Sequence, residues 1–204
     1  MQNAAFAARG LDWAYLPLLV EDGQVEDAIR GLVALGFAGA NVTAPHKAEA
    51  ARLTDTKLDS VNTLIVRNGR VEGHSTDTAI LEGLTAEQPV ILGSGGAAAA
   101  FAAHLPEARV FSRRGAWPPD VADADVVVNA TSERDSVLVG LAEGQTLVDL
   151  PYPETATGRA ARAAGATVID GREVLVAQGG AAFELWTGMP APVEVMRAAV
   201  GLRA

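Results

Sequence analysis

Residues 41–47 read Asn-Val-Thr-Ala-Pro-His-Lys, and the rest of the chain can be arranged around this stretch. The apolar run 36–40 before it predicts a short buried strand, which Pro45 would end. Proline is also accepted in the first turn of a helix, so a helix is expected over residues 47–53. The sequence therefore predicts a strand end, a tight turn and a helix start in succession.

Polar side chains in this corner are candidates for ligand binding, because ligands of open α/β sheets bind where strands end. They are Asn41, Thr43 and Lys47. A lysine is more often a solvated surface residue, and that alternative stays open on the local sequence. Asp77 also has two interpretations. Asp77 or Thr76 could be the N-cap of a predicted helix over residues 78–84, or Asp77 could be a carboxylate with a chemical role.

The composition narrows the class of protein. The 204 residues carry a formal net charge of −9, which argues against general binding to nucleic acid or to an anionic membrane. No cysteine is present, which excludes disulfides, thiolate zinc sites and cysteine nucleophiles. No apolar run approaches the roughly 20 residues of a membrane span, and no signal peptide is recognised, so a cytoplasmic protein is expected. The three histidines are too scattered to predict a metal site.

The first half of the chain mixes helices with short strands. Hydrophobic periodicity, Gly10 as a helix end and the hairpin turn Asn68-Gly69 mark the boundaries. Helices are expected over residues 3–9 and 25–35, and strands over 13–20, 59–67 and 70–73.

In the second half, the apolar strand 89–92 runs into a glycine-rich turn and an alanine-rich helix that ends near His104. The turn consists of Gly93, Ser94, Gly95, Gly96 and Ala97. With Ala98 in the place of a third small residue, it fits the dinucleotide-binding fingerprint, in which glycines permit the turn and the approach of a pyrophosphate to a helix N-terminus.

The next predicted strand, 108–111, ends in Ser112, Arg113 and Arg114. An acidic residue here would hold the ribose 2′-hydroxyl of NAD, whereas arginines suit the 2′-phosphate of NADP. The alternative is a pair of solvated loop arginines. The sequence favours NADP.

Strands and helices alternate to the end of the chain. Strands are expected over residues 126–131, 146–150 and 166–169, and helices over 155–164, 173–186 and 191–202. This alternation predicts an α/β fold with a parallel sheet and right-handed crossovers. The first of these strands ends in Asn129, Ala130 and Thr131, which would lie near the nicotinamide.

Taken in order, the motifs resemble those of the shikimate dehydrogenase family. They occupy residues 41–47, 61–63, 76–77, 93–97, 129–131, 152–153, 175–178 and 183–188. The resemblance implies two α/β lobes: a substrate-binding domain over 1–78, on which a C-terminal helix at 191–204 packs back, and a Rossmann-like NADP-binding domain over 79–190. It implies reversible reduction of 3-dehydroshikimate to shikimate by NADPH, a step of aromatic amino-acid biosynthesis.

The resemblance also implies residue roles. Lys47 and Asp77 would be the catalytic pair: an ammonium stabilises charge on the ketone oxygen and can donate a proton, while the carboxylate fixes the lysine and a substrate hydroxyl. Substrate hydroxyls would be bound by Thr43, Asn62 and Gln178, with Tyr152 nearby. Without the resemblance, Gln178 is equally an ordinary helix-surface residue.

The cofactor would be held by Gly93, Ser94, Gly95, Gly96, Ala97, Ser112, Arg113, Arg114, Asn129, Ala130, Thr131 and Gly171. The expected partner is a small-molecule substrate, with no nucleic acid and no membrane. A homodimer is compatible with the sequence, which does not fix the oligomeric state.

The chain also departs from the family. The usual first strand and His-Ser-x-Ser-Pro turn, whose serines bind the substrate carboxylate, are not found, so either Met1 is an internal methionine or the protein is a reduced relative with impaired substrate binding. Ser75 stands where the family usually has Asn, and residues 132–135 replace a Gly-Met pair. The region 114–125 is short enough to have lost a helix. Two alternatives to a shikimate dehydrogenase follow: a catalytically impaired binding protein, or a quinate/shikimate dehydrogenase.

Overall fold

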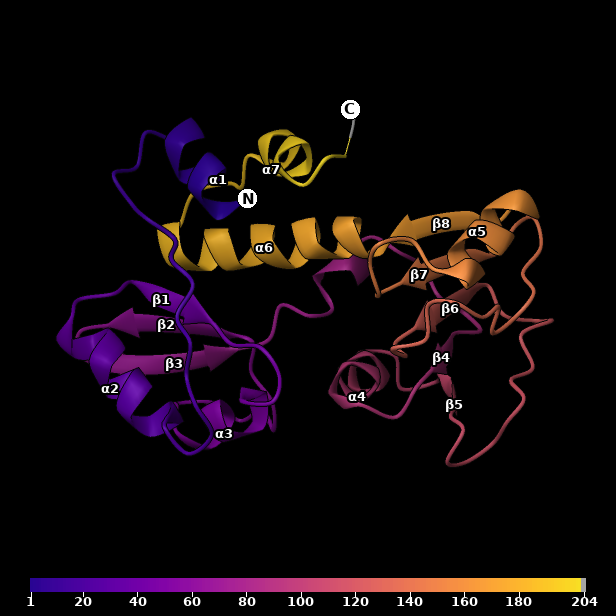
Figure 1. The fold of residues 1–204 in the computed structure, drawn as a ribbon, viewed down its shortest axis with the longest axis horizontal. Helices are drawn as coiled ribbons and strands as arrows, with labels where there is room; N and C mark the ends of the chain where they lie inside the picture. The colour runs from indigo at the N-terminus through magenta and orange to yellow at the C-terminus, as the bar shows by residue number, and fades with distance from the viewer. Residues whose placement is uncertain (203–204) are drawn as a thin grey trace. The chain divides into compact units, whose positions relative to one another are not determined.

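The computed structural model describes residues 1–202, which divide into two compact units (Figure 1). The first unit comprises Met1–Thr76 and the chain from Val176 onward, and the second is Asp77–Leu175. The elements of the first unit are α1 (Gln2–Ala8), α2 (Val25–Ala34), β1 (Gly39–Asn41), α3 (Lys47–Arg52), β2 (Thr63–Arg67), β3 (Arg70–His74) and α7 (Val193–Ala199). Helix α6 (Gly171–Thr187) begins in the second unit and continues in the first. No helix among the described residues is long and apolar enough to span a bilayer.

The sheet of the first unit is antiparallel, in the order β1-β2-β3. The predicted hairpin is confirmed: Asn68 and Gly69 have φ angles of 51° and 76°, the positive values that a type I′ turn requires. The predicted strand 36–40 is wrong at its start, since β1 begins at Gly39. Gly36, with a φ angle of 72°, and the bond from the Phe37 N–H to the Leu32 carbonyl instead close the C-terminus of α2.

The strand predicted over residues 13–20 is not formed. A strand needs a hydrogen-bonded neighbour, and the structure has a groove of about 400 Å³ lined both by this segment and by residues 35–39 at the edge of β1. Large apolar side chains of the segment are consequently exposed, most of all Leu19 at 90%. The aromatic and β-branched composition predicted a strand, but composition carries no information about pairing.

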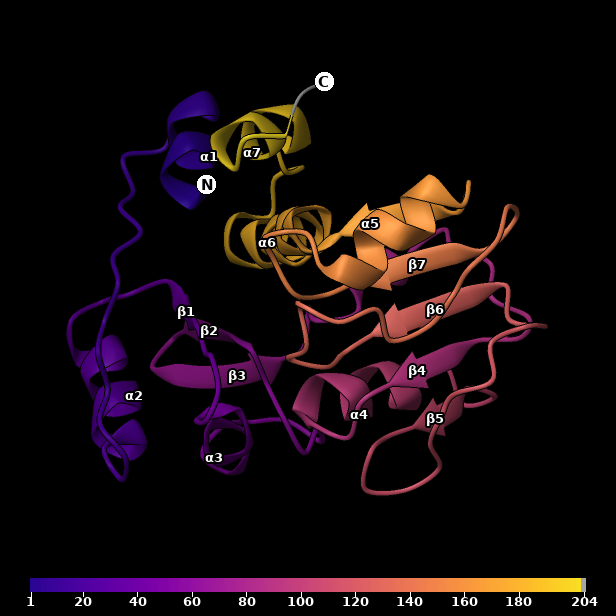
Figure 2. The same ribbon diagram turned by 45° about the vertical axis from the view of Figure 1, so that its right-hand side comes forward.

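Helices α1 and α7 pack beside the C-terminal part of α6 (Figure 2). Phe6 stacks on Phe183, and Met196 is fully buried in the same cluster. The sheet approaches α6 closely, because the Trp186 indole donates to the Leu64 carbonyl of β2 at 2.9 Å, and a side chain at Gly39 of β1 would collide with both groups. These contacts join residues more than a hundred positions apart in the sequence.

The second unit contains a parallel sheet in the order β5-β4-β6-β7-β8. Its elements are the single 3-10 turn η1 (Ala79–Leu81), β4 (Val90–Leu92), α4 (Gly96–His104), β5 (Arg109–Phe111), β6 (Val126–Asn129), β7 (Thr146–Asp149), α5 (Ala156–Ala163) and β8 (Thr167–Asp170). The chain reverses direction across the sheet between β5 and β6, as in a doubly wound fold. The predicted α/β fold class is confirmed.

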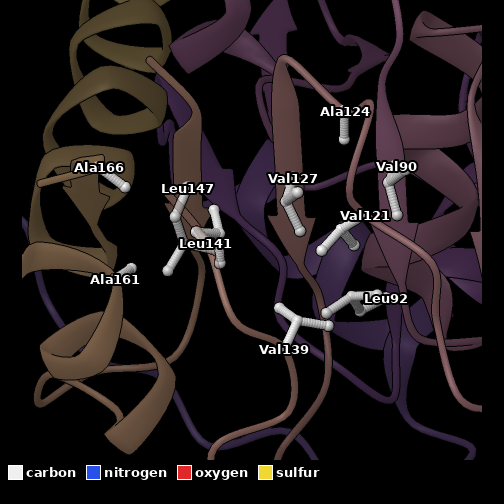
Figure 3. Close-up of a cluster of buried hydrophobic side chains, with 10 residues drawn as sticks. All are labelled: Val90, Leu92, Val121, Ala124, Val127, Val139, Leu141, Leu147, Ala161 and Ala166. Carbon is white, nitrogen blue, oxygen red and sulfur yellow. The ribbon is translucent and has the colours of Figure 1, made fainter. Parts of the chain in front are cut away.

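The two faces of this sheet are covered differently. Phe101 of α4 and Val174 of α6 pack on one face, together with Leu81. The other face is covered by α5 and by two segments without helix, which contribute Val121, Val139 and neighbouring residues to the cluster in Figure 3. Residues 114–125 form no helix, as their short length predicted. Irregular chain thus covers part of this face of the sheet.

The helix predicted over residues 78–84 is mostly absent, since only η1 forms. Its N-cap is Thr78, without a side-chain cap bond, and the Thr76 hydroxyl bonds elsewhere. The hypothesis that Asp77 or Thr76 caps a helix here is therefore wrong. Gly83, with a φ angle of 81°, turns the chain before a second helical turn can be completed.

Asp170, the last residue of β8, fixes the start of α6 and should make stability depend on pH. Burial alone would raise the pKa of its carboxyl, but hydrogen bonds from the Arg172 side chain and from the N–H groups of Arg172 and Glu173 lower the pKa below its ordinary value. A depressed folded-state pKa stabilises the fold above the unfolded pKa of about 3.9, and that stabilisation is lost as the pH falls through the lower, folded value. Urea unfolding of wild type and Asp170→Asn from pH 7 to pH 2.5 measures this effect. The difference in unfolding free energy between the two proteins should shrink in the acid range. A difference in unfolding free energy that stays constant with pH would contradict this role of Asp170.

Candidate functional site

The predicted substrate residue Asn62 lies at the centre of a buried polar cluster in the first unit. Its side-chain oxygen accepts hydrogen bonds from the Thr76 N–H at 2.8 Å and the Thr63 hydroxyl at 3.0 Å. Its amide nitrogen lies 3.1 Å from the Thr76 hydroxyl and 3.4 Å from the Gln178 side-chain oxygen. The structure therefore brings Asn62 and Gln178 together, although 116 positions separate them.

The cluster extends along the sheet to Asn41 and Tyr15. The Asn41 amide donates to the Thr63 hydroxyl at 3.1 Å, and the Tyr15 hydroxyl donates to the Asn41 oxygen at 2.9 Å. Burial raises the pKa of Tyr15, so its hydroxyl stays protonated and a donor at neutral pH. A continuous chain of neutral groups thus orients the Asn62 amide, which is the type of group that binds a polyol.

Thr43 and Lys47 lie on either side of the turn that enters α3. Thr43 is exposed, and its carbonyl accepts the His46 N–H. Lys47 is the first residue of α3, and its carbonyl accepts the Val61 N–H at 3.1 Å. The backbone therefore ties the start of α3 to the residue before Asn62. Asp77, the other predicted catalytic residue, opens the second unit one position after Thr76.

The glycine turn of the second unit connects β4 to α4, between the carboxyl ends of β5 and β6. Gly93 has a φ angle of 130°, donates its N–H to the Phe111 carbonyl at 2.8 Å, and leaves no room for a side chain, since a Cβ would lie 2.8 Å from the Ala130 oxygen. At Gly95 and Gly96 the space is open. A narrow glycine turn followed by open backbone at a helix N-terminus fits a pyrophosphate group.

Buried hydrogen bonds hold Asn129 and Thr131, two of the residues predicted to lie near the nicotinamide. The Asn129 oxygen accepts the Thr131 N–H and hydroxyl at 3.2 and 2.8 Å, and its amide donates to Asp149 at 2.7 Å. The second Asp149 oxygen accepts the Thr155 hydroxyl at 2.7 Å. Sequence reasoning missed Asp149 and Thr155. A carboxylate at the end of the apolar strand β7 was the available signal, because a fully buried charge requires partners.

The arginines predicted to bind the 2′-phosphate follow β5. Arg114 is exposed, and the Ser112 carbonyl accepts the Gly115 N–H, which closes a turn around them. The Arg113 guanidinium lies 5.9 Å from the centre of the Trp117 ring and 3.5 Å from a carboxylate oxygen of Glu133. Neither Trp117 nor Glu133 was assigned a site role from the sequence.

The remaining candidates lie beyond β7. Tyr152 is 53% exposed, and its carbonyl accepts a bond from Arg134. Gly171 opens α6 and is buried against the Leu150 carbonyl, where a side chain would collide. Close packing therefore accounts for this glycine. Among residues 1–202, no group of three or more His, Asp or Glu residues could hold a metal ion.

Asn62→Ala should weaken substrate binding by more than its effect on stability explains. It leaves the Thr76 N–H without its buried acceptor, which costs about 2 kcal/mol of unfolding free energy, and it should raise the KM for a hydroxylated substrate about tenfold. Gln145→Ala is the matched control, because the Gln145 amide makes three bonds, to Val121, Ala124 and Ala142, away from the cluster. It should lower stability similarly without changing KM; an equal rise in KM in both variants would contradict a binding role.

Two family patterns match the sequence. The pattern described as the shikimate dehydrogenase substrate binding domain matches residues 1–64. The pattern described as the shikimate 5′-dehydrogenase C-terminal domain matches residues 171–200.

Curated relatives match over the whole chain. A protein of Anaeromyxobacter dehalogenans named shikimate dehydrogenase (NADP(+)) is 37% identical over 251 residues, covering 100% of this chain and 90% of the relative. One of the same name from Methanopyrus kandleri is 36% identical and covers 98% and 89%. An alignment of 251 positions exceeds the 204 residues of this chain, so the relative contains segments without a counterpart here.

Solved structures share the fold. Shikimate 5-dehydrogenase of Thermus thermophilus, in complex with NADP(H) and shikimate, superposes with a TM-score of 0.85 at 27% identity, covering 97% of this chain and 91% of that one. Quinate dehydrogenase of Corynebacterium glutamicum, in complex with NAD, gives 0.79 at 26% identity and covers 97% and 91%.

Proposed function

The chain belongs to the shikimate dehydrogenase family, and we propose that it transfers a hydride reversibly between NADPH and 3-dehydroshikimate, giving shikimate. The observation that carries the proposal is the 37% identity, over the full length of the chain, to a relative named for NADP(+). The neutral polar cluster around Asn62 supports a hydroxylated substrate, and the Gly93 turn supports a dinucleotide.

In the proposed function, NADPH supplies the hydride when it is bound. The glycine turn and the start of α4 would hold the pyrophosphate, with Ser94 and Ala97 exposed beside it. Arg113 and Arg114 would bind the 2′-phosphate after the turn at Ser112. The buried Asn129–Asp149 pair would keep Ala130 and Thr131 in position on the nicotinamide side.

The substrate would be held by neutral groups of the first unit. The Asn62 and Gln178 amides and the Thr43 hydroxyl would bind substrate hydroxyls, and Tyr152 would lie near the ring. Because Asn62 is fixed on both sides of its amide, its orientation is set before the substrate arrives. Such preorganisation lowers the entropy lost on binding.

The chemical step is assigned to Lys47 and Asp77. Reduction of the ketone builds negative charge on its oxygen, which the Lys47 ammonium would stabilise and protonate. The Asp77 carboxylate would orient that ammonium and a neighbouring substrate hydroxyl. Support comes from the backbone bonds that fix the start of α3 and from the bond that holds Thr76, the residue before Asp77.

Each ligand would be bound by a different domain. Residues 1–78, with the C-terminal helix, would bind substrate, and residues 79–190 would bind NADP. The enzyme would act in the cytoplasm as a homodimer or a monomer, without nucleic-acid or membrane partners, in line with its net charge of −9.

A spectrophotometric assay of NADPH formation from NADP⁺ and shikimate tests this function. Turnover with shikimate supports the proposal. Quinate is the second substrate to test, because a quinate dehydrogenase is among the structural neighbours. Turnover with quinate alone would change the substrate assignment, and turnover with neither, at saturating NADP⁺, would favour a binding protein that has lost catalysis.

A further inference from the structure

The loop after β6 carries a carboxylate that is held in place beside Arg113. One oxygen of Glu133 accepts the N–H groups of Asp135 and Ser136 at 3.0 and 3.1 Å. The Glu133 N–H donates to the Thr131 hydroxyl at 3.2 Å, which ties the loop to the nicotinamide-side residues. The other Glu133 oxygen lies 3.5 Å from the Arg113 guanidinium.

The carboxylate is ionised at neutral pH. The hydrogen bonds from the Asp135 and Ser136 backbone, and the nearby positive charge of Arg113, outweigh the effect of burial and lower the pKa of Glu133 below its ordinary value. A full negative charge therefore stands at the carboxyl edge of the sheet, fixed by the backbone rather than by a flexible surface contact.

Arg113 is held from a second side. Its guanidinium lies over the Trp117 ring, an arrangement that limits the orientations of the side chain. Two anions would then compete for the Arg113 guanidinium. One is the Glu133 carboxylate, which lies beside it in the structure, and the other is the 2′-phosphate of NADP, which would bind there in the proposed function.

We propose that Glu133 weakens the binding of NADP, because its carboxylate competes with the 2′-phosphate of NADP for Arg113. The difference in affinity between NADP and NAD is thereby reduced. The inference rests on the proposed function. The carboxylate would repel the 2′-phosphate dianion but not the 2′-hydroxyl of NAD, so its effect falls on one cofactor only. Since both groups are accessible to solvent, the expected effect is modest, about fivefold in dissociation constant at low salt, and smaller at high salt.

The test is the binding of each nucleotide to the full chain, measured by isothermal titration calorimetry without substrate. Glu133→Gln removes the charge and keeps an oxygen that can accept the backbone bonds. It should lower the Kd for NADP⁺ about fivefold and leave the Kd for NAD⁺ unchanged. Glu143→Gln is the matched control, because Glu143 is exposed and lies just before β7, at the amino edge of the sheet. It should change neither constant.

A double-mutant cycle with Arg113→Gln separates competition from general repulsion. In the Arg113→Gln background, Glu133→Gln should improve NADP⁺ binding by less than in the wild type. An unchanged or raised Kd for NADP⁺ in Glu133→Gln, with wild type binding NADP⁺ normally, overturns this inference and leaves the proposed function standing. Wild type that binds neither nucleotide overturns both.

Discussion

Replacing Lys47 by alanine is expected to lower kcat for shikimate oxidation about a thousandfold, with a much smaller change in the KM for NADP⁺. The ammonium would act on charge that develops during the reaction, and a group that acts mainly on the transition state affects kcat more than ground-state binding. Steady-state kinetics over a range of both substrates measures the two constants separately.

The control is Lys57→Ala, which removes the other lysine of the sequence from an exposed position. It should retain wild-type kinetics. If Lys47→Ala turns over shikimate as fast as the Lys57 variant, the chemical role of Lys47 is wrong. Circular dichroism should show both variants folded, because neither removes a buried apolar group.

The second large effect is expected at Asp77. Asp77→Asn keeps the size of the side chain but removes the charge that would orient the lysine, and should lower kcat about a hundredfold. The decreases in kcat should not be multiplicative, because the two groups would act as a pair. The double variant Lys47→Ala/Asp77→Asn should be only slightly slower than Lys47→Ala alone.

Asp120→Asn is the matched control for this change, since Asp120 is exposed and lies in the segment between β5 and β6. It should leave kcat unchanged. Fully multiplicative losses in the double variant would show that Asp77 acts independently of Lys47, and would refute the pairing even if each single variant were slow.

Local signals predicted the second unit well. Its strands are short apolar runs bounded by turn residues, and buried parallel strands have just this pattern. The Gly93 turn was recognisable because only glycine accepts its φ angle and its contact with Ala130. The first unit was harder. The segment 13–20 has strand composition, but whether it pairs depends on chain far away in sequence.

The candidate site residues were named from the sequence by their positions, which carry no information about the contacts of their side chains. The family resemblance implied substrate-binding roles for Asn62 and Gln178, but no local pattern could show that their side chains meet across 116 positions. Asp149 was overlooked because it ends a strand with otherwise ordinary composition. Glu133 was visible in the sequence only as part of a departure from the family, and its pairing with Arg113 depends on strand order, which places the ends of β5 and β6 on either side of β4.

A crystal structure of the protein with NADP⁺ and shikimate would test the central claim most directly. We expect the Lys47 ammonium to lie within about 3.2 Å, the hydrogen-bond range, of the reacting substrate hydroxyl on the side that faces the nicotinamide. The Asp77 carboxylate should lie within the same range of that ammonium and of the neighbouring substrate hydroxyl. A complex in which shikimate binds with its ring against the nicotinamide, while the Lys47 ammonium points away from the reacting hydroxyl or the Asp77 carboxylate points away from the neighbouring one, would contradict this expectation.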